Sequence, residues 1–136
     1  MNHQGHQAKE QVSAAADEIA RAVIDAGLKV HKALGPGLLE SAYEHCLAYE
    51  LVSRGLSVRR QVPMPILYEG VALDAGYRLD LLANEQVIVE IKAVDALTLL
   101  HEAQVLTYLK LSKLRLGLLI NFNVPLFKQG VRRLAF

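Results

Sequence analysis

Three charged residues on two neighbouring apolar segments are the part of the sequence best suited to chemistry. Asp80 lies in the segment 77–83, and Glu90 and Lys92 lie two residues apart in the segment 86–93. Successive side chains of a β-strand point to opposite faces, so Glu90 and Lys92 would share one face. Charges on an otherwise apolar strand are costly unless they are paired or bind an ion.

A tight turn at Asn84 and Glu85 would fold the two segments into a hairpin. If the turn is centred at residue 85, Asp80 and Glu90 face each other, with Cβ atoms about 4.5–5.5 Å apart. Two carboxylates at that spacing repel each other, and a divalent ion such as Mg²⁺ relieves the repulsion. Lys92 beside them would position or help deprotonate a water, or stabilise negative charge. The alternative is a charged cluster on an exposed sheet face, since so short a pattern also arises by chance.

A third acid, Glu40, follows the chain break Gly35-Pro36-Gly37 and lies in the first turn of a predicted helix, with Tyr43 on the same side. Glu40 could join the ion site or simply complement the helix dipole. Tyr43 is otherwise expected to be a core aromatic residue.

A polar stripe of His101, Gln104 and Tyr108 falls on one face of a predicted helix over 99–111, capped by Thr98. Such a stripe on a largely buried helix indicates specific hydrogen bonds, whereas the alternative is a solvated face. The apolar residues expected to pack around it are Leu99, Leu100, Ala103, Leu106 and Leu109.

The remaining periodicities supply the elements that would position these residues. Apolar steps of three and four predict helices over 16–34 and 38–54, the second with an apolar stripe of Leu39, Tyr43, Cys46, Leu47 and Leu51. Pro63 and Pro65 restrict the strand after residue 58 to an edge or a bulge. Further strands are predicted at 66–68, 71–73, 77–83, 86–93 and 116–122, and the tail 124–136 fits a short strand or helix. A mixed sheet flanked by helices follows.

Length and composition favour one compact domain. The chain has 136 residues, of which 52% are hydrophobic, and we expect a polar, flexible segment at 1–15, including His3 and His6 as tail residues, followed by a domain at 16–136. A net charge of +1 is too low for a protein that coats DNA, so any nucleic-acid surface must be local. The lone cysteine, the absence of an apolar leader and the lack of a membrane-length apolar run favour a cytoplasmic protein.

The combination of motifs resembles a known family. Gly37-x-x-Glu40-x-x-Tyr43 is similar to the signature of the GxxExxY proteins, which are placed in the PD-(D/E)XK nuclease superfamily. The resemblance runs from His31 to Phe122 and includes the Asp80 strand, Glu90-Ile91-Lys92-Ala93, Gln104-x-x-x-Tyr108 and the segment 117–122.

The resemblance implies a restriction-endonuclease-like α/β core, α-β-β-β-α-β, preceded here by an additional N-terminal helix. It implies that Asp80, Glu90, the Ile91 carbonyl and Glu40 bind Mg²⁺ or Mn²⁺, and that Lys92 is the catalytic lysine. Gln104 and Tyr108 match a motif that supports the active site or substrate in RecB-like and Cas4-like nucleases. Together with Tyr43 and His101 they are the expected supporting residues.

The implied activity is metal-dependent hydrolysis of phosphodiester bonds in nucleic acid. DNA is the expected substrate, and repair, recombination or defence is the expected setting. A noncatalytic module that binds nucleic acid or protein and retains the metal site is the alternative, motivated by the small size and near-neutral charge. A homodimer or a partner protein would help so small a core to span a duplex.

Overall fold

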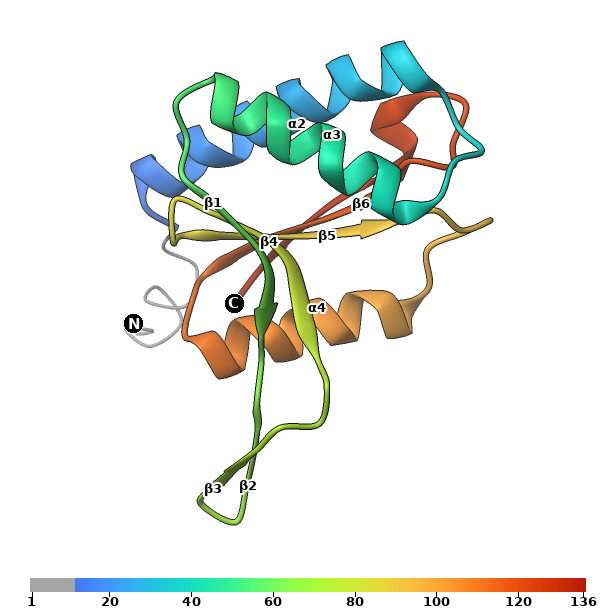
Figure 1. Ribbon diagram of the computed structural model, residues 1–136. Coiled ribbons are helices and arrows are strands. Elements are labelled where there is room, and N and C mark those ends of the chain that lie inside the picture. Colours follow the sequence, from blue (N-terminus) through green and yellow to red (C-terminus); the bar gives the residue numbers. More distant parts are fainter. Residues whose placement is uncertain (1–11) are drawn as a thin grey trace, which may run out of the picture.

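A computed structural model describes residues 12–136 and contains one mixed β-sheet with helices on both faces (Figure 1). His3, His6 and most of the predicted flexible segment lie outside the described residues. The elements in chain order are α2 (Ala14–Leu34), α3 (Glu40–Ser53), β1 (Val58–Pro63), β2 (Ile66–Tyr68), β3 (Val71–Leu73), β4 (Arg78–Ala83), β5 (Val87–Lys92), α4 (Leu99–Ser112), β6 (Leu116–Asn121), the 3₁₀ helix η1 (Phe127–Gly130) and β7 (Val131–Ala135).

The five strands of the main sheet are arranged in the order β1-β4-β5-β6-β7. The β5–β6 pair is parallel and the other three pairs are antiparallel. A parallel pair needs a crossover connection, and α4 supplies it. The order α3-β1-β4-β5-α4-β6 confirms the predicted restriction-endonuclease-like core, with α2 as the additional N-terminal helix.

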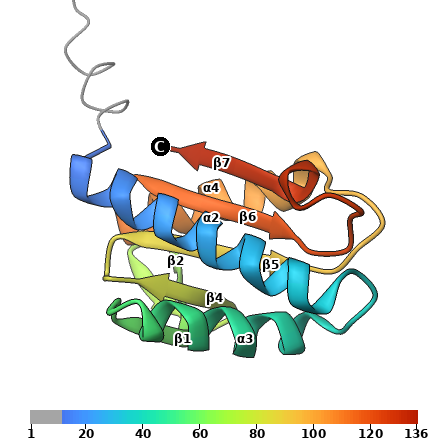
Figure 2. The ribbon, with the colours of Figure 1, turned by 90° about the horizontal axis from the view of Figure 1, so that it is seen from above.

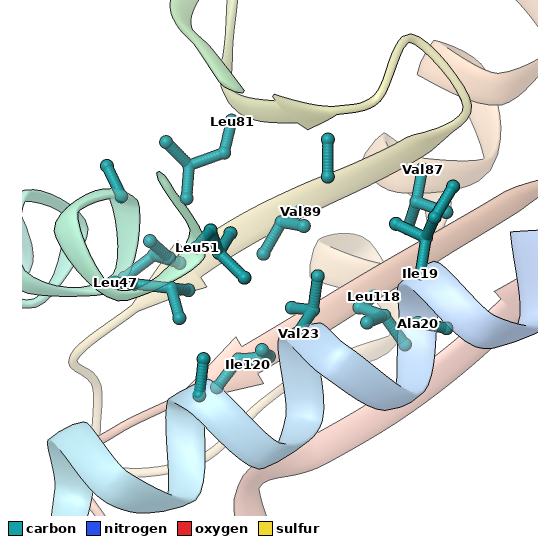
Figure 3. Packing of buried hydrophobic residues seen from close by; sticks show 14 of the residues in the cluster. Ile19, Ala20, Val23, Leu47, Leu51, Leu81, Val87, Val89, Leu118 and Ile120 are labelled. Atoms are coloured by element: carbon teal, nitrogen blue, oxygen red, sulfur yellow. The ribbon is translucent and has the colours of Figure 1, made fainter. Parts of the chain in front are cut away.

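Helices α2 and α3 lie side by side across one face of the sheet (Figure 2). Their apolar stripes, which include Val23 and Leu47, meet Val87, Val89 and Leu118 from the sheet, and these side chains are fully buried (Figure 3). Helix α4 covers the opposite face. The central strands β5 and β6 are therefore covered on both sides, which explains why their sequences are almost continuously apolar.

Local sequence signals set the ends of α2. The Ser13 hydroxyl accepts a hydrogen bond from the Ala16 N–H at 3.0 Å and caps the N-terminus of this helix. Gly35 ends it with a φ of 68°, a conformation that glycine adopts without steric cost. The helix begins at Ala14, two residues before the periodicity alone would place it.

Several leucines predicted to be buried are exposed instead. Leu39 was expected in the apolar stripe of α3, but it is the residue before the first turn and is 78% exposed. Leu99 and Leu100 are 82% and 78% exposed, and Ala103 is also exposed, so the expected packing around the start of α4 is wrong. The buried residues of α4 are Val105, Tyr108 and Leu109, because only the later turns of this helix lie against the sheet.

The predicted hairpin at 66–73 forms, with Glu69 and Gly70 at its turn in positive-φ conformations. It projects from the sheet on the side of α4 (Figure 1). The strand before it, β1, is an edge strand that ends at Pro63, as the two prolines predicted. Most of the hairpin's apolar side chains are exposed, so the hairpin contributes little to the core.

The tail forms both of the alternatives left open for it, the short helix η1 and the edge strand β7. Phe127 of η1 packs against Gly27 of α2, where a Cβ atom would lie 2.6 Å from the phenyl ring. The close approach ties the C-terminal segment to the N-terminal helix. No helix within residues 12–136 has the length and apolar character needed to cross a bilayer.

Candidate metal centre

Strands β4 and β5 bring Asp80 and Glu90 together at the point where their backbones separate. The backbone pairing of the two strands extends as far as Leu81 and Val89, and the same register places Asp80 opposite Glu90. Past Leu81 and Val89, side-chain carboxylates instead of backbone carbonyls accept the hydrogen bonds between the two strands. The Asp80 N–H donates to Glu90 Oε1 at 2.9 Å, and the Ile91 N–H donates to Asp80 Oδ2 at 2.8 Å. Each carboxylate therefore holds the backbone of the other strand, and the predicted hairpin register is confirmed.

The regular alternation of β4 is interrupted at Asp80. Leu81 packs on the side of α2 and α3, whereas Leu79, two residues earlier, packs on the side of α4. The neighbouring strand β1 has the same interruption at Gln61, whose φ is +52°. A positive φ at a residue other than glycine is uncommon and is found repeatedly at functional sites. The local distortion is confined to the part of the sheet that carries the acids.

Glu90 is almost fully enclosed, with 4% of its surface exposed. Burial and, next, the charge of Asp80 raise the pKa of the Glu90 carboxyl to about 8. Burial and the charge of Glu44 likewise raise the pKa of Asp80, against the lowering effect of the Ile91 N–H, Gln61 and Lys92. The structure thus keeps two poorly solvated carboxyl groups side by side, an arrangement in which a cation would be strongly stabilised.

Glu40, the first residue of α3, reaches the end of β5. Its Oε2 accepts a hydrogen bond from the Ala93 N–H at 3.2 Å, and its charge contributes to the raised pKa of Glu90. Lys92 is half-buried and acts in the opposite direction, lowering the pKa of both Asp80 and Glu90. Glu90 is therefore within electrostatic reach of the other three residues expected to form the centre, Glu40, Asp80 and Lys92.

Two further residues of this region were not predicted from the sequence. The Gln61 side-chain amide donates to Glu44 Oε1 at 2.8 Å and to Asp80 Oδ1 at 3.4 Å. Glu44 is buried, and Arg60 donates to its Oε2 through two N–H groups, at 3.1 and 2.9 Å. These hydrogen bonds connect Arg60, Glu44, Gln61 and Asp80 in series, and they restrain the aspartate from the side of β1. Glu44 falls one helical turn after Glu40, a spacing that would have drawn attention to it, but Gln61 carries no such signal.

Tyr43 is a buried aromatic residue, as expected, and also has a polar role. Its hydroxyl donates to the Gly35 carbonyl at 2.6 Å and accepts from the Leu38 N–H at 3.1 Å. Its ring stacks on Phe122 with 4.5 Å between the centroids. Tyr43 therefore fixes the loop that precedes Glu40 and sets where α3 begins.

Tyr108 of α4 lies within electrostatic reach of Glu90 and Asp80, and Gln104 is its hydrogen-bond partner. The Gln104 side-chain amide donates to the Tyr108 hydroxyl at 3.0 Å. Burial raises the pKa of Tyr108 to about 12, with the charge of Glu90 as the next cause. His101 has a local function instead: its Nδ1 accepts from the Thr98 N–H at 3.0 Å, as part of the N-terminal cap of α4.

The donor set of the centre suits a hard divalent cation. Within residues 12–136, no three His, Cys, Asp or Glu side chains converge as ligands of one ion. Mg²⁺ does not require such a cluster, because it is bound through one or two carboxylates, with water and phosphate oxygens completing the octahedron. Asp80 and Glu90 supply two carboxylates, and the Ile91 backbone carbonyl, expected from the sequence as a further ligand, would add a third hard oxygen. The residues present therefore fit Mg²⁺ or Mn²⁺.

The sequence of the chain is similar to one known protein family. No curated protein and no solved structure matches the chain significantly. A sequence model of the PD-(D/E)XK nuclease superfamily, however, matches residues 17–134, a span that contains the whole sheet up to β7, the helices on both of its faces and every residue of the candidate centre. The chain therefore belongs to the PD-(D/E)XK nuclease superfamily.

Proposed function

We propose that this chain is a nuclease that hydrolyses phosphodiester bonds of DNA with Mg²⁺ or Mn²⁺. The observation that carries the proposal is a pair of carboxylates, the buried Glu90 and the half-buried Asp80, brought together from neighbouring strands with Lys92 beside them. Such a pair is costly to bury without a cation, and it has no ion pair with a lysine or arginine among the described residues.

Each residue has a role that follows from its place. Asp80, Glu90 and the Ile91 carbonyl would hold the ion, and Glu40 would contribute through water or a second ion. When bound, the ion supplies Lewis-acid polarisation of the phosphodiester. Lys92, on the same strand as Glu90, would hold the attacking water in line and offset negative charge that develops on the phosphate.

The supporting residues keep this arrangement in place. Tyr43 anchors the loop before Glu40, and Tyr108 of α4, which Gln104 contacts, lies within electrostatic reach of the acids. His101 acts through the cap of that helix. The shared Gly37-x-x-Glu40-x-x-Tyr43 pattern supports assignment to the GxxExxY group, and DNA repair, recombination or defence in the cytoplasm is the setting we expect.

Cleavage assays test the proposal. Labelled single-stranded, duplex and branched DNA would be incubated with the protein and Mg²⁺ or Mn²⁺, and each reaction repeated with EDTA. Asp80→Ala and Lys92→Ala should reduce the metal-dependent rate by at least about 100-fold, since each removes a group needed at the reacting phosphate. Asp25→Ala and Lys128→Ala, on exposed surfaces, are matched controls and should cleave like the unmodified protein.

The outcomes separate catalysis from contamination and from simple binding. Metal-dependent cleavage that survives both Asp80→Ala and Lys92→Ala would belong to a contaminant or to another site. Calorimetric Mn²⁺ binding that requires Asp80, without cleavage of any substrate, would favour the noncatalytic binding module. Light scattering on the same samples would show whether the active species is a monomer or a homodimer.

A further inference from the structure

A pocket of about 390 Å³ opens between α4 and the β2–β3 hairpin, next to the candidate metal centre. One wall is formed by residues of α4, including Leu100, Gln104 and Tyr108, and the other by Ile66 and Tyr77. Tyr108 belongs to both regions, because the charges of Glu90 and Asp80 act on its hydroxyl. The pocket therefore lies close to the two acids.

The walls combine aromatic and aliphatic surface. The rings of Tyr77 and Tyr108 meet edge to face, with 6.3 Å between centroids and 66° between planes. Tyr77 is 43% exposed, and Leu100 is 78% exposed at the mouth of the pocket. The Tyr77 carbonyl accepts a hydrogen bond from the Met64 N–H at 2.9 Å, so the backbone that carries this ring is held to the neighbouring segment. The pocket thus has an aromatic wall, and the Tyr77 ring in it is partly accessible to a ligand.

The chemistry of the lining favours an uncharged, flat, partly polar group. The lining residues include no aspartate, glutamate, lysine or arginine, so a phosphate would find no counter-charge there. The Gln104 amide and the Thr107 hydroxyl supply hydrogen-bonding groups beside the apolar walls. Stacking on an aromatic ring with a few polar contacts at the edge is how proteins bind unpaired nucleobases.

We propose that this pocket binds an unpaired base of the substrate strand, close to the scissile phosphate, with Tyr77 as its stacking residue. The inference rests on the proposed nuclease function and narrows its substrate to nucleic acid that is single-stranded or frayed at the cleavage site. A base inside a duplex is stacked and paired on both sides, and it would have to leave the helix to enter the pocket.

Binding of single-stranded DNA tests the proposal. Fluorescence anisotropy would be measured with Mg²⁺ in the Lys92→Ala background, so that binding is read without cleavage. Tyr77→Leu should raise Kd by about 5- to 100-fold, the usual range for loss of one stacked base. Tyr77→Phe keeps the ring and should bind nearly as well as its parent. Tyr49→Leu is the matched control, because Tyr49 lies on α3, outside the pocket, and is 71% exposed; this change should leave Kd unaltered.

A series of oligonucleotides, each with one abasic nucleotide at a different position, locates the base. One position should weaken binding to the parent protein and have no further effect on Tyr77→Leu, because the base and the ring act together. Ala103→Leu places a larger side chain at the pocket wall without removing a contact. Like Tyr77→Leu, it should raise the Kd for single-stranded DNA.

Two patterns of results distinguish the pocket from the catalytic centre. If no abasic position changes Kd, or if Tyr77→Leu and Tyr49→Leu have equal Kd values, the proposed base-binding pocket is refuted even if the protein cleaves DNA. A Tyr77-dependent base position in a protein that shows neither Mn²⁺ binding nor cleavage supports the pocket and removes the nuclease proposal.

Discussion

Replacing Glu90 by glutamine should stabilise the metal-free protein, and the gain should grow as the pH rises from about 5 to about 8. Glu90 is buried beside Asp80, and in the absence of a cation its ionised form is repelled by that neighbour and poorly solvated. Glutamine has nearly the same shape, and its side-chain oxygen can still accept the hydrogen bond from the Asp80 N–H. The substitution therefore removes the charge and retains the packing.

The magnitude follows from the difference between the folded and unfolded pKa of Glu90. Below its ordinary pKa of 4.5 the carboxyl is protonated in both states, and it adds no pH dependence. Between 4.5 and about 8 the unfolded chain has released the proton that the folded chain retains, so the free energy of unfolding falls as the pH rises. At about 1.4 kcal/mol per pH unit the total loss reaches about 5 kcal/mol above pH 8, an upper limit because Asp80 shares the repulsion.

Urea unfolding in EDTA at pH 5, 6, 7 and 8 measures this effect. The difference in unfolding free energy between Glu90→Gln and the unmodified protein should widen by up to about 1.4 kcal/mol per pH unit. Glu18→Gln, at an exposed position of α2, is the matched control, and its difference should stay constant. A Glu90→Gln difference that does not change between pH 5 and 8 would refute the reasoning about burial and repulsion. Saturating Mg²⁺ should stabilise the unmodified protein more at pH 8 than at pH 6, since the ion competes with the proton.

Three other substitutions test the supporting structure. Gln61→Leu, which removes the amide contact to Asp80, should weaken Mn²⁺ binding about 10- to 100-fold in calorimetry, and unchanged affinity would mean that the contact does not position the ligand. Gly130→Ala should lower the free energy of unfolding by about 2 kcal/mol or more, because its Cβ would lie 2.0 Å from the Asn121 carbonyl oxygen; a normal urea midpoint would contradict this. Tyr43→Phe should cost about 1–2 kcal/mol in the same assay through its two lost hydrogen bonds, and an equal midpoint would show them to be without net effect.

Local sequence signals were sufficient to predict the centre of the fold. The turn at residues 84–85 determines the register of β4 and β5, so the opposition of Asp80 and Glu90 could be worked out by counting from it. The alternation along β5 correctly predicted that Val87 and Val89 lie on one face of the sheet and Glu90 on the other. Both signals act within about ten residues of sequence, a range over which hairpin geometry is nearly independent of the rest of the chain.

Features that depend on distant parts of the chain could not be predicted in this way. The contact of Gln61 with Asp80 requires β1 to pair with β4 across an intervening hairpin, and its positive φ has no signature in the sequence. The exposure of Leu99 and Leu100 depends on how far α4 extends past the sheet, which periodicity does not encode. Apolar spacing shows which face of a helix is suited to burial, whereas tertiary packing decides how much of that face is covered.

The most direct test of the metal-centre proposal is anomalous diffraction from crystals of this protein soaked in Mn²⁺. We expect a peak between the Asp80 and Glu90 carboxylates and the Ile91 carbonyl, and we expect the peak to be lost in Asp80→Ala crystals. Ordered Asp80 and Glu90 side chains with no peak between them at saturating Mn²⁺, or a peak that persists in Asp80→Ala, would contradict the assignment of these residues as the metal ligands.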